Sequence, residues 1–290
     1  MRPIFRFLAD RFEQAESFDP ASAKVAEVVE KAVPQGAIRE FLAGTWLGHP
    51  LHPVLTDVPI GAWVAAGFLD VFGGEESRPA ARKLIGFGAL AALPTALAGL
   101  VDWLDTDDAA VKRVGLAHAA GNVGALALYL MSWRSRRKGH QGRGVVLATI
   151  AGSAMVGTAY LGGHMSFAQG VGVDETTFEE GPKTWKALDV TPDRLTDGKK
   201  MRGNVGQVRL LLYRSGDTIY ALSDHCSHRG CALAGGQIEG TGDDVAVVCP
   251  CHGSTFRLVD GEILHGPATA PQPAYEARIN GEKVEVRLRQ

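Results

Sequence analysis

Two short stretches near the carboxyl end of this sequence hold residues that could bind a metal. The first contains Cys226 and His228, with one residue between them, and the second contains Cys249 and His252, with two residues between them. Thiolate sulfur and imidazole nitrogen together bind zinc, and they also hold the iron of some iron–sulfur clusters. The spacing therefore predicts a metal centre with two sulfur and two nitrogen ligands.

Zinc alone leaves part of this pattern unexplained. All four cysteines of the chain lie between positions 226 and 251, so each ligand pair has a further cysteine beside it, Cys231 in the first stretch and Cys251 in the second. A zinc site with two cysteines and two histidines gives these two residues no role. Zinc remains the alternative, because spacing by itself does not exclude it.

The residues around both stretches are typical of a small antiparallel β domain. Short runs with β-branched and aromatic residues alternate with turn pairs such as Asp260-Gly261 and Asn280-Gly281. Runs of this length, separated by such turns, indicate strands joined by hairpins. We expect this β domain to occupy residues 186–290, with the metal-binding stretches in two of its loops.

The two stretches, Cys226-Ser227-His228 and Cys249-Pro250-Cys251-His252, resemble the two boxes of Rieske [2Fe–2S] proteins. In that family, thiolates hold one iron of the cluster and imidazoles hold the other. The resemblance implies that Cys226 and Cys249 are the sulfur ligands and that His228 and His252 are the nitrogen ligands. It also implies one-electron transfer as the function.

The same resemblance gives the remaining cysteines a role. In the quinol-oxidising branch of the family, the matching pair forms a disulfide that ties the two loops together, which implies a bond between Cys231 and Cys251. A structural disulfide points to an oxidising compartment.

Three neighbouring residues are expected to form the surroundings of the cluster. The family places a hydroxyl donor at the position of Ser254, which follows Gly253, and it places a proline-bearing loop over the cluster, here at Pro267. Many members with high reduction potential have a tyrosine donor where this chain has Phe256, which cannot donate. Because hydrogen bonds to the cluster tune its potential, we expect an intermediate value within the Rieske range.

The other half of the chain is apolar and is expected to lie in a membrane. Four segments have the length and composition of membrane-spanning helices, at about 20 residues each; they are residues 54–73, 84–104, 114–133 and 144–162. The predicted fold is therefore α + β with two domains, a four-helix transmembrane bundle followed by the all-β domain. The expected boundaries are an amphipathic amino-terminal segment at 1–48, the transmembrane domain at 49–164, a linker at 165–185 and the β domain at 186–290.

Residues 40–173 also resemble a family of four-helix bacterial membrane domains with no established activity. The residues that carry this resemblance are the stretch from Leu42 to Pro53 at its start, and Leu161-Gly162-Gly163-His164 and Gly170-Val171-Gly172-Val173 at its end. The resemblance implies a multi-pass protein of a bacterial cell membrane in contact with lipid.

The positive charges of the loops predict an orientation. Lysines and arginines gather in the first loop, at 78–83, and in the third, at 134–143. Cytoplasmic loops are enriched in these residues, so both loops are expected inside. An even number of spans then places the β domain on the outer face.

Four histidines of the apolar half are expected at one membrane face. These are His49, His52, His118 and His164, and span parity brings them to the same side. A histidine within a span is a functional candidate, and two imidazoles on facing helices suit a b-type haem. On sequence grounds His118 and His164 form the best pair, and the alternative is that all four are polar residues at helix ends.

The sequence as a whole favours an electron carrier anchored in the membrane. Its partners would be a quinol or a membrane redox protein as donor, and a haem protein or another acceptor. The alternatives are a ferredoxin-like donor to an oxygenase, or a redox-sensing or assembly protein. We identify no independent catalytic residues, and a net charge of −2 argues against nucleic acid binding.

Overall fold

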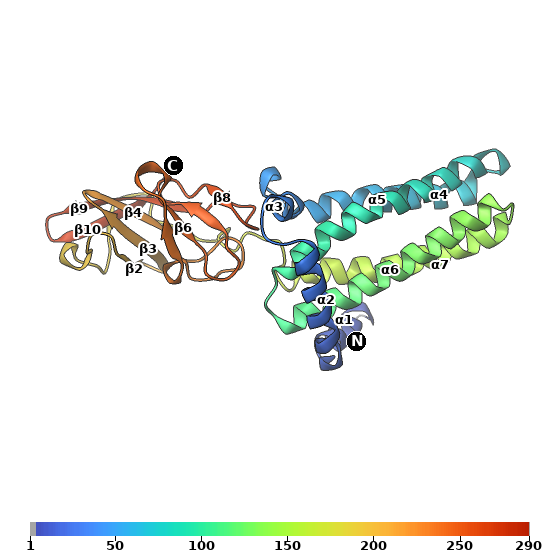
Figure 1. Ribbon diagram of the computed structural model, residues 1–290, viewed down its shortest axis with the longest axis horizontal. Helices are drawn as coiled ribbons and strands as arrows, with labels where there is room; N and C mark the ends of the chain where they lie inside the picture. Colours follow the sequence, from blue (N-terminus) through green and yellow to red (C-terminus); the bar gives the residue numbers. More distant parts are fainter. Residues whose placement is uncertain (1–3, 290) are drawn as a thin grey trace. The chain divides into compact units, whose positions relative to one another are not determined.

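The computed structural model describes residues 4–289, which divide into two compact units (Figure 1). The first unit contains the chain up to Pro34 together with Pro50–Val171. The second contains Gln35–His49 and the chain from Gly172 onward. The packing thus differs from the expected boundaries, because residues 35–49 and much of the expected linker belong to the β unit.

Four long helices dominate the first unit. They have 22 to 29 residues each, which at about 1.5 Å per residue exceeds the roughly 30 Å of a bilayer core. The prediction of four membrane-spanning helices is confirmed for the described part of the chain. Two shorter helices precede them, and the bounds are α1 (Ile4–Glu13), α2 (Asp19–Ala32), α4 (Leu51–Phe72), α5 (Arg78–Leu104), α6 (Ala109–Arg137) and α7 (Gln141–Phe167).

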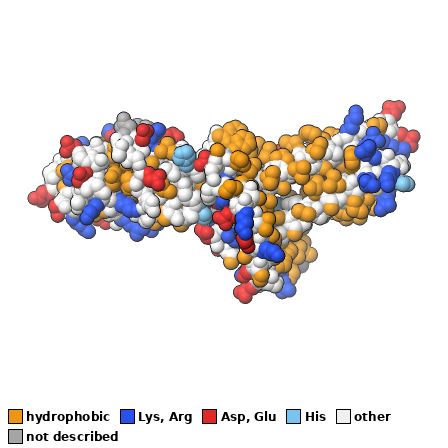
Figure 2. Space-filling view, viewed as in Figure 1, with side chains coloured by type: hydrophobic (Ala, Val, Ile, Leu, Met, Phe, Trp, Pro, Cys, Tyr) orange, Lys and Arg blue, Asp and Glu red, His pale blue; other side chains and the backbone are white. Residues whose placement is uncertain are grey.

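The surface of the long helices is apolar, as a lipid-facing surface must be. Large side chains such as Val64, Phe68 and Leu90 are more than half exposed. Figure 2 shows hydrophobic side chains along these helices and Lys and Arg side chains gathered at the end with the α4–α5 and α6–α7 loops. The two positively charged loops therefore lie at the same end of the bundle.

An ion pair and an aromatic stack hold α4 against α6 inside the bundle. The guanidinium of Arg136 donates to both carboxylate oxygens of Asp70, at 2.6 and 2.5 Å, and the two side chains are 1% and 5% exposed. Trp63 stacks on Tyr129 with ring centroids 4.1 Å apart. Charges in an apolar interior persist only when they are paired in this way.

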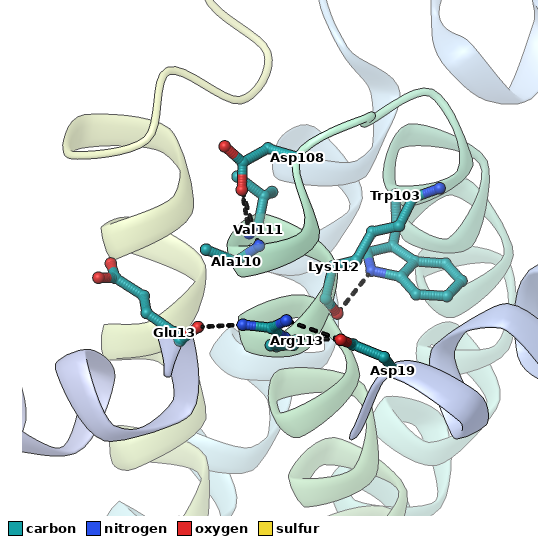
Figure 3. A network of polar contacts seen from close by, with 8 residues as sticks. All are labelled: Glu13, Asp19, Trp103, Asp108, Ala110, Val111, Lys112 and Arg113. Carbon is teal, nitrogen blue, oxygen red and sulfur yellow. Dashed lines mark hydrogen bonds and ion pairs between the residues drawn. The ribbon is translucent and has the colours of Figure 1, made fainter. Parts of the chain in front are cut away.

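The amino-terminal helices dock on the opposite end of the bundle (Figure 3). Arg113 of α6 donates to both carboxylate oxygens of Asp19, at 2.6 and 2.7 Å, and to the backbone oxygen of Glu13 at 2.9 Å. Asp108 caps the start of α6 by accepting from two backbone N–H groups. Helices α1 and α2 are thus fixed to the end at which α4 begins and α5 ends.

The second unit is an antiparallel β domain with two sheets. The larger has the strand order β1-β10-β9-β4-β3-β2, and the smaller has the order β5-β6-β7-β8. The strands of the larger sheet are β1 (Lys186–Ala187), β2 (Lys200–Val205), β3 (Val208–Ser215), β4 (Thr218–Ser223), β9 (Ala274–Asn280) and β10 (Lys283–Leu288). Those of the smaller are β5 (Gln237–Glu239), β6 (Ala246–Val248), β7 (Thr255–Arg257) and β8 (Ile263–His265).

A buried apolar cluster lies against the metal-binding loops. It contains Leu211 and Leu222 of the larger sheet and Phe256 of the smaller sheet, together with Cys226 and Cys249. Phe256 is fully buried, so its ring serves the core of the domain. The cysteines that the sequence predicts as ligands are therefore anchored in the core.

Candidate metal centre

The two predicted metal-binding stretches form the same kind of turn. Loop 1 (Cys226–Cys231) follows β4, and loop 2 (Cys249–Ser254) joins β6 to β7. In each loop the first cysteine donates its N–H to the carbonyl five residues on, and its own carbonyl accepts from a glycine four residues on. These glycines, Gly230 and Gly253, have φ of 69° and 76°, a conformation that glycine adopts without steric cost. The repeated turn presents each cysteine and its histidine from a fixed backbone.

Only two of the four cysteines can supply thiolates. Cys231 and Cys251 are joined by a disulfide, as the family resemblance implied, and the bond links loop 1 to loop 2. Their sulfurs lie within 4.8 Å of that of Cys249, but a disulfide sulfur is a poor metal ligand. Cys226 and Cys249 are free and buried, and their thiols are hydrogen-bonded to each other. The sulfur pair available to a metal is therefore Cys226 and Cys249.

The two histidines face each other beside these thiols. The ring centroids of His228 and His252 are 5.1 Å apart, with the planes at 88°. With a metal–nitrogen bond of about 2.0–2.1 Å, two imidazoles on one tetrahedral metal have centroids roughly 5.2 Å apart. The spacing thus fits two imidazole ligands of one iron, and the donor set of two thiols and two imidazoles fits a [2Fe–2S] cluster.

The protonation of these groups suits metal binding. Burial lowers the pKa of His228 to about 3, so the ring is neutral at pH 7 and has a lone pair for a metal. The hydrogen bond between the thiols raises the pKa of Cys226 and lowers that of Cys249 to about 6. Cys249 is therefore the thiol of the pair that loses its proton first.

The expected surroundings of the cluster are all near loop 2. Ser254 is fully buried, and its hydroxyl accepts a hydrogen bond from the N–H of Ala268 at 3.1 Å. Pro267 is buried in the same segment. Ser254 thus connects loop 2 to the proline loop, and its own proton remains available for another acceptor.

Sequence reasoning missed Gln272, which holds loop 1 in place. Its side chain is 2% exposed and accepts from the N–H of Ser227 at 2.9 Å. Its amide nitrogen donates to the carbonyls of Ser223 and His225, at 2.9 and 2.7 Å. A buried glutamine that meets three backbone groups substitutes for missing strand pairing.

We expect Gln272→Ala to loosen loop 1. The change leaves the N–H of Ser227 and two carbonyls without their partner, at a cost of about 1–3 kcal/mol for each unsatisfied group that stays buried. Thermal unfolding and iron content of the purified protein measure the effect. Gln237→Ala, at an exposed position of β5, is the matched control. Equal melting temperatures for both variants would contradict this role.

The sequence also gave no sign that residues before the first span reach the β domain. Helix α3 (Ala37–Ala43) packs beside the proline loop, where Glu40 accepts from the N–H of Gly266 at 3.0 Å. Thr45 donates to the carbonyl of Gly266 at 2.7 Å. Arg39 is 5% exposed, and its charge helps to lower the pKa of His228, with a smaller effect than burial, His252 and Arg229. This segment therefore belongs to the wall of the metal centre.

The four histidines of the apolar half do not form the expected pair. His118 faces His52, with ring centroids 6.4 Å apart. His164 instead contacts Glu13, with Nε2 2.7 Å from the carboxylate. His49 is exposed and belongs to the β unit. Helix direction groups His52, His118 and His164 at one end of the bundle, but packing selects His52 as the neighbour of His118.

Comparisons with known proteins agree with both units. Residues 185–276 match the family model described as the Rieske [2Fe-2S] domain, and residues 48–175 match the model described as a predicted membrane protein (DUF2231). The 3-phenylpropionate/cinnamic acid dioxygenase ferredoxin subunits of Shigella boydii serotype 4 and Escherichia coli K12 are each 33% identical over 92 residues. That match covers 32% of this chain and 83% of each relative.

A solved structure is also similar to part of the chain. The ferredoxin of carbazole 1,9a-dioxygenase from Nocardioides aromaticivorans IC177 has 26% sequence identity and a TM-score of 0.33. The similarity covers 37% of this chain and 99% of that one.

Fold and site together define an iron–sulfur electron-transfer protein: two matched loops on a small antiparallel β domain present two thiols and two imidazoles. The chain belongs to the Rieske [2Fe–2S] family, through its carboxyl-terminal domain. Four apolar helices anchor this domain to a membrane. Electron transfer at the membrane is its function.

Proposed function

We propose that this protein carries single electrons from quinol, or from a redox protein in the membrane, to a haem protein or a similar acceptor. The observation that supports the proposal is the fusion of a Rieske domain to four spans, which holds the redox site near lipid-soluble donors. The cofactors of this proposal are a [2Fe–2S] cluster in the β domain and a b-type haem in the helical unit.

The residues of the β domain have distinct tasks in this proposal. The cluster supplies a one-electron redox change when bound. Cys226 and Cys249 contribute the negative charge, whereas His228 and His252 are neutral ligands, which makes reduction easier than with four cysteines. The ring nitrogen of each histidine that does not bind metal can exchange a proton with a quinol hydroxyl. In this proposal the Ser254 hydroxyl donates a hydrogen bond toward the cluster and raises its potential.

Anaerobic reduction of the purified full-length protein in lipid nanodiscs tests the donor. We expect quinol to bleach the visible absorption of the oxidised protein, and we expect dithionite to bleach it fully. Bleaching by dithionite but not by quinol would contradict quinol as the donor.

A second candidate is electron donation to an oxygenase. The similarity to ferredoxin subunits of a dioxygenase favours it. In that case an NADH-dependent ferredoxin reductase should reduce the protein, and the reduced protein should transfer its electron to an oxygenase component. The same nanodisc preparation distinguishes the two donors when each is added alone.

We further propose that the β domain lies on the outer face of a bacterial cell membrane. The Lys and Arg residues of the α4–α5 and α6–α7 loops support this orientation, as does the Cys231–Cys251 disulfide. Glu282→Cys in the exposed β9–β10 turn should react with an impermeant maleimide added to whole cells, and Lys138→Cys should react only after lysis. The reverse labelling pattern would overturn the orientation.

A further inference from the structure

The four spans are two copies of one helical hairpin. Helix α4 repeats in α6 at an offset of 66 residues, and three pairs of equivalent positions are in contact. These pairs are His52 with His118, Trp63 with Tyr129, and Asp70 with Arg136. Contact between equivalent positions is the property of a two-fold interface, here within a single chain.

The second helix of each hairpin repeats as well, at an offset of 63 residues. Thr95 of α5 and Thr158 of α7 are equivalent, and each accepts a hydrogen bond at its backbone oxygen from a histidine of the preceding helix. Gly99 and Gly162 are also equivalent. A Cβ added to either would lie against a histidine ring, 2.7 Å from His52 and 3.1 Å from His118. In each hairpin, the second helix therefore holds one imidazole in the same way, with a threonine carbonyl and a glycine.

These hydrogen bonds fix the tautomer of both rings. Nδ1 of His52 lies 2.8 Å from the oxygen of Thr95, and Nδ1 of His118 lies 2.7 Å from the oxygen of Thr158. A carbonyl can only accept, so both Nδ1 atoms carry the proton and both Nε2 atoms keep a lone pair. Metal-binding histidines are commonly oriented by such a bond from the other ring nitrogen.

The distance between the rings fits ligands on opposite sides of one metal. Their centroids are 6.4 Å apart. With a metal–nitrogen bond of about 2.0–2.1 Å, two imidazoles on opposite sides have centroids roughly 6.3–6.5 Å apart, against roughly 5.2 Å on a tetrahedral metal. The centroid separation of His52 and His118 thus differs from that of His228 and His252, which fits two ligands of a tetrahedral metal.

A bare ion would lack ligands at this place. Among residues 4–289, neither imidazole belongs to a group of three or more His, Cys, Asp or Glu ligand atoms that all lie within 4.8 Å of one another. Zinc in proteins takes three or four protein ligands. Haem iron brings four equatorial nitrogens of its own and needs only two axial imidazoles.

We propose that His52 and His118 are the axial ligands of a b-type haem held between the two hairpins. This assignment rests on the haem of the proposed function and does not depend on which donor reduces the cluster. In the present structure the amide of Asn122 lies 3.1 Å from Nε2 of His118 and is fixed by the hydroxyl of Thr158. The Asn122 amide therefore donates to the lone pair on Nε2 of His118, and this side chain must rotate away for iron to bind there.

Interhelical hydrogen bonding alone is the competing explanation for the two histidines. It accounts for Nδ1 of both rings, since polar side chains link helices in lipid. It does not account for a repeat that brings the two rings together across the hairpins. The two explanations predict different results for haem content.

The test uses the full-length protein purified in mild detergent from cells supplied with a haem precursor. We expect a Soret band, a low-spin ferric signal and a single haem per chain by pyridine haemochromogen assay. His52→Ala and His118→Ala should each lose most of the bound haem, and added imidazole should restore the low-spin spectrum. His49→Ala and His140→Ala, at exposed positions, should keep the haem.

Absence of a Soret band from the wild-type protein, including after addition of haemin, would overturn the proposal. So would an unchanged spectrum in both alanine variants. Elution as a single species in detergent verifies that the variants are folded, and imidazole rescue separates ligand loss from misfolding. Reduction of the cluster by quinol is measured separately, so failure of the haem site leaves that result intact.

Discussion

Cys226→Ser and Cys249→Ser should each remove nearly all of the iron–sulfur cluster from the purified protein. Both thiols are buried in the core beside the fully buried Phe256, so no other described cysteine can replace them while Cys231 and Cys251 stay in their disulfide. A serine hydroxyl stays protonated at neutral pH and is a harder ligand than thiolate, which iron in these clusters prefers. Visible absorption, the paramagnetic signal of the reduced protein, and iron and sulfide content measure the loss.

His225→Ala and His265→Ala are the matched controls for this experiment. Both residues lie close to the site in the sequence, and the side chain of His265 is 72% exposed. They should keep the cluster, whereas His228→Ala and His252→Ala should lose it. Zinc in place of iron and sulfide in the wild-type protein would refute the cluster itself, and full iron content in a Cys226→Ser variant would refute the ligand assignment.

Arg136→Leu should destabilise the helical unit by about 3–5 kcal/mol, because it leaves the carboxylate of Asp70 buried without its partner. The guanidinium also donates to the hydroxyl of Ser132, which in turn donates to the carbonyl of Gly144 in α7. The change therefore weakens the contacts of α6 with both α4 and α7. Thermal unfolding in detergent is the measurement.

A double replacement distinguishes charge burial from packing. Asp70→Leu with Arg136→Leu removes both charges, and we expect it to recover much of the lost stability, since apolar pairs often replace buried ion pairs without loss. Arg137→Leu is the control, because this residue is exposed and its guanidinium lies over the Trp133 ring, with Cζ 4.8 Å from the ring centroid. If Arg136→Leu and Arg137→Leu unfold at the same temperature, the ion pair contributes little.

The sequence predicts the four spans well because hydrophobic length is a property of each segment. The helices nevertheless begin earlier than the apolar windows: α5 begins at Arg78, whereas the apolar run begins at Leu84. Lys83 and Arg82 lie within the helix at its loop end, where charged side chains reach water. The apolar run therefore marks the part of the helix that lies in lipid. The backbone hydrogen bonds determine where the helix itself begins and ends.

Contacts between residues far apart in the chain could not be predicted from the sequence. Nothing near Gln272 suggests that its amide would meet Ser227, 45 residues earlier in the chain. The choice of His52 as the neighbour of His118 depends on the repeat of the two hairpins. That repeat keeps few identical residues, and it becomes visible only once equivalent positions are seen in contact.

The assignment of residues 35–49 to the β unit has a consequence for how an electron carrier of this kind can work. The backbone passes between the two units at Pro34–Gln35, at His49–Pro50 and at Val171–Gly172. A domain joined by a single flexible linker can move through a large volume. Three covalent connections restrict the rotation and displacement of the β unit much more strongly. We therefore expect electron delivery over short excursions, with partners that come to the β domain, in place of a long-range shuttle.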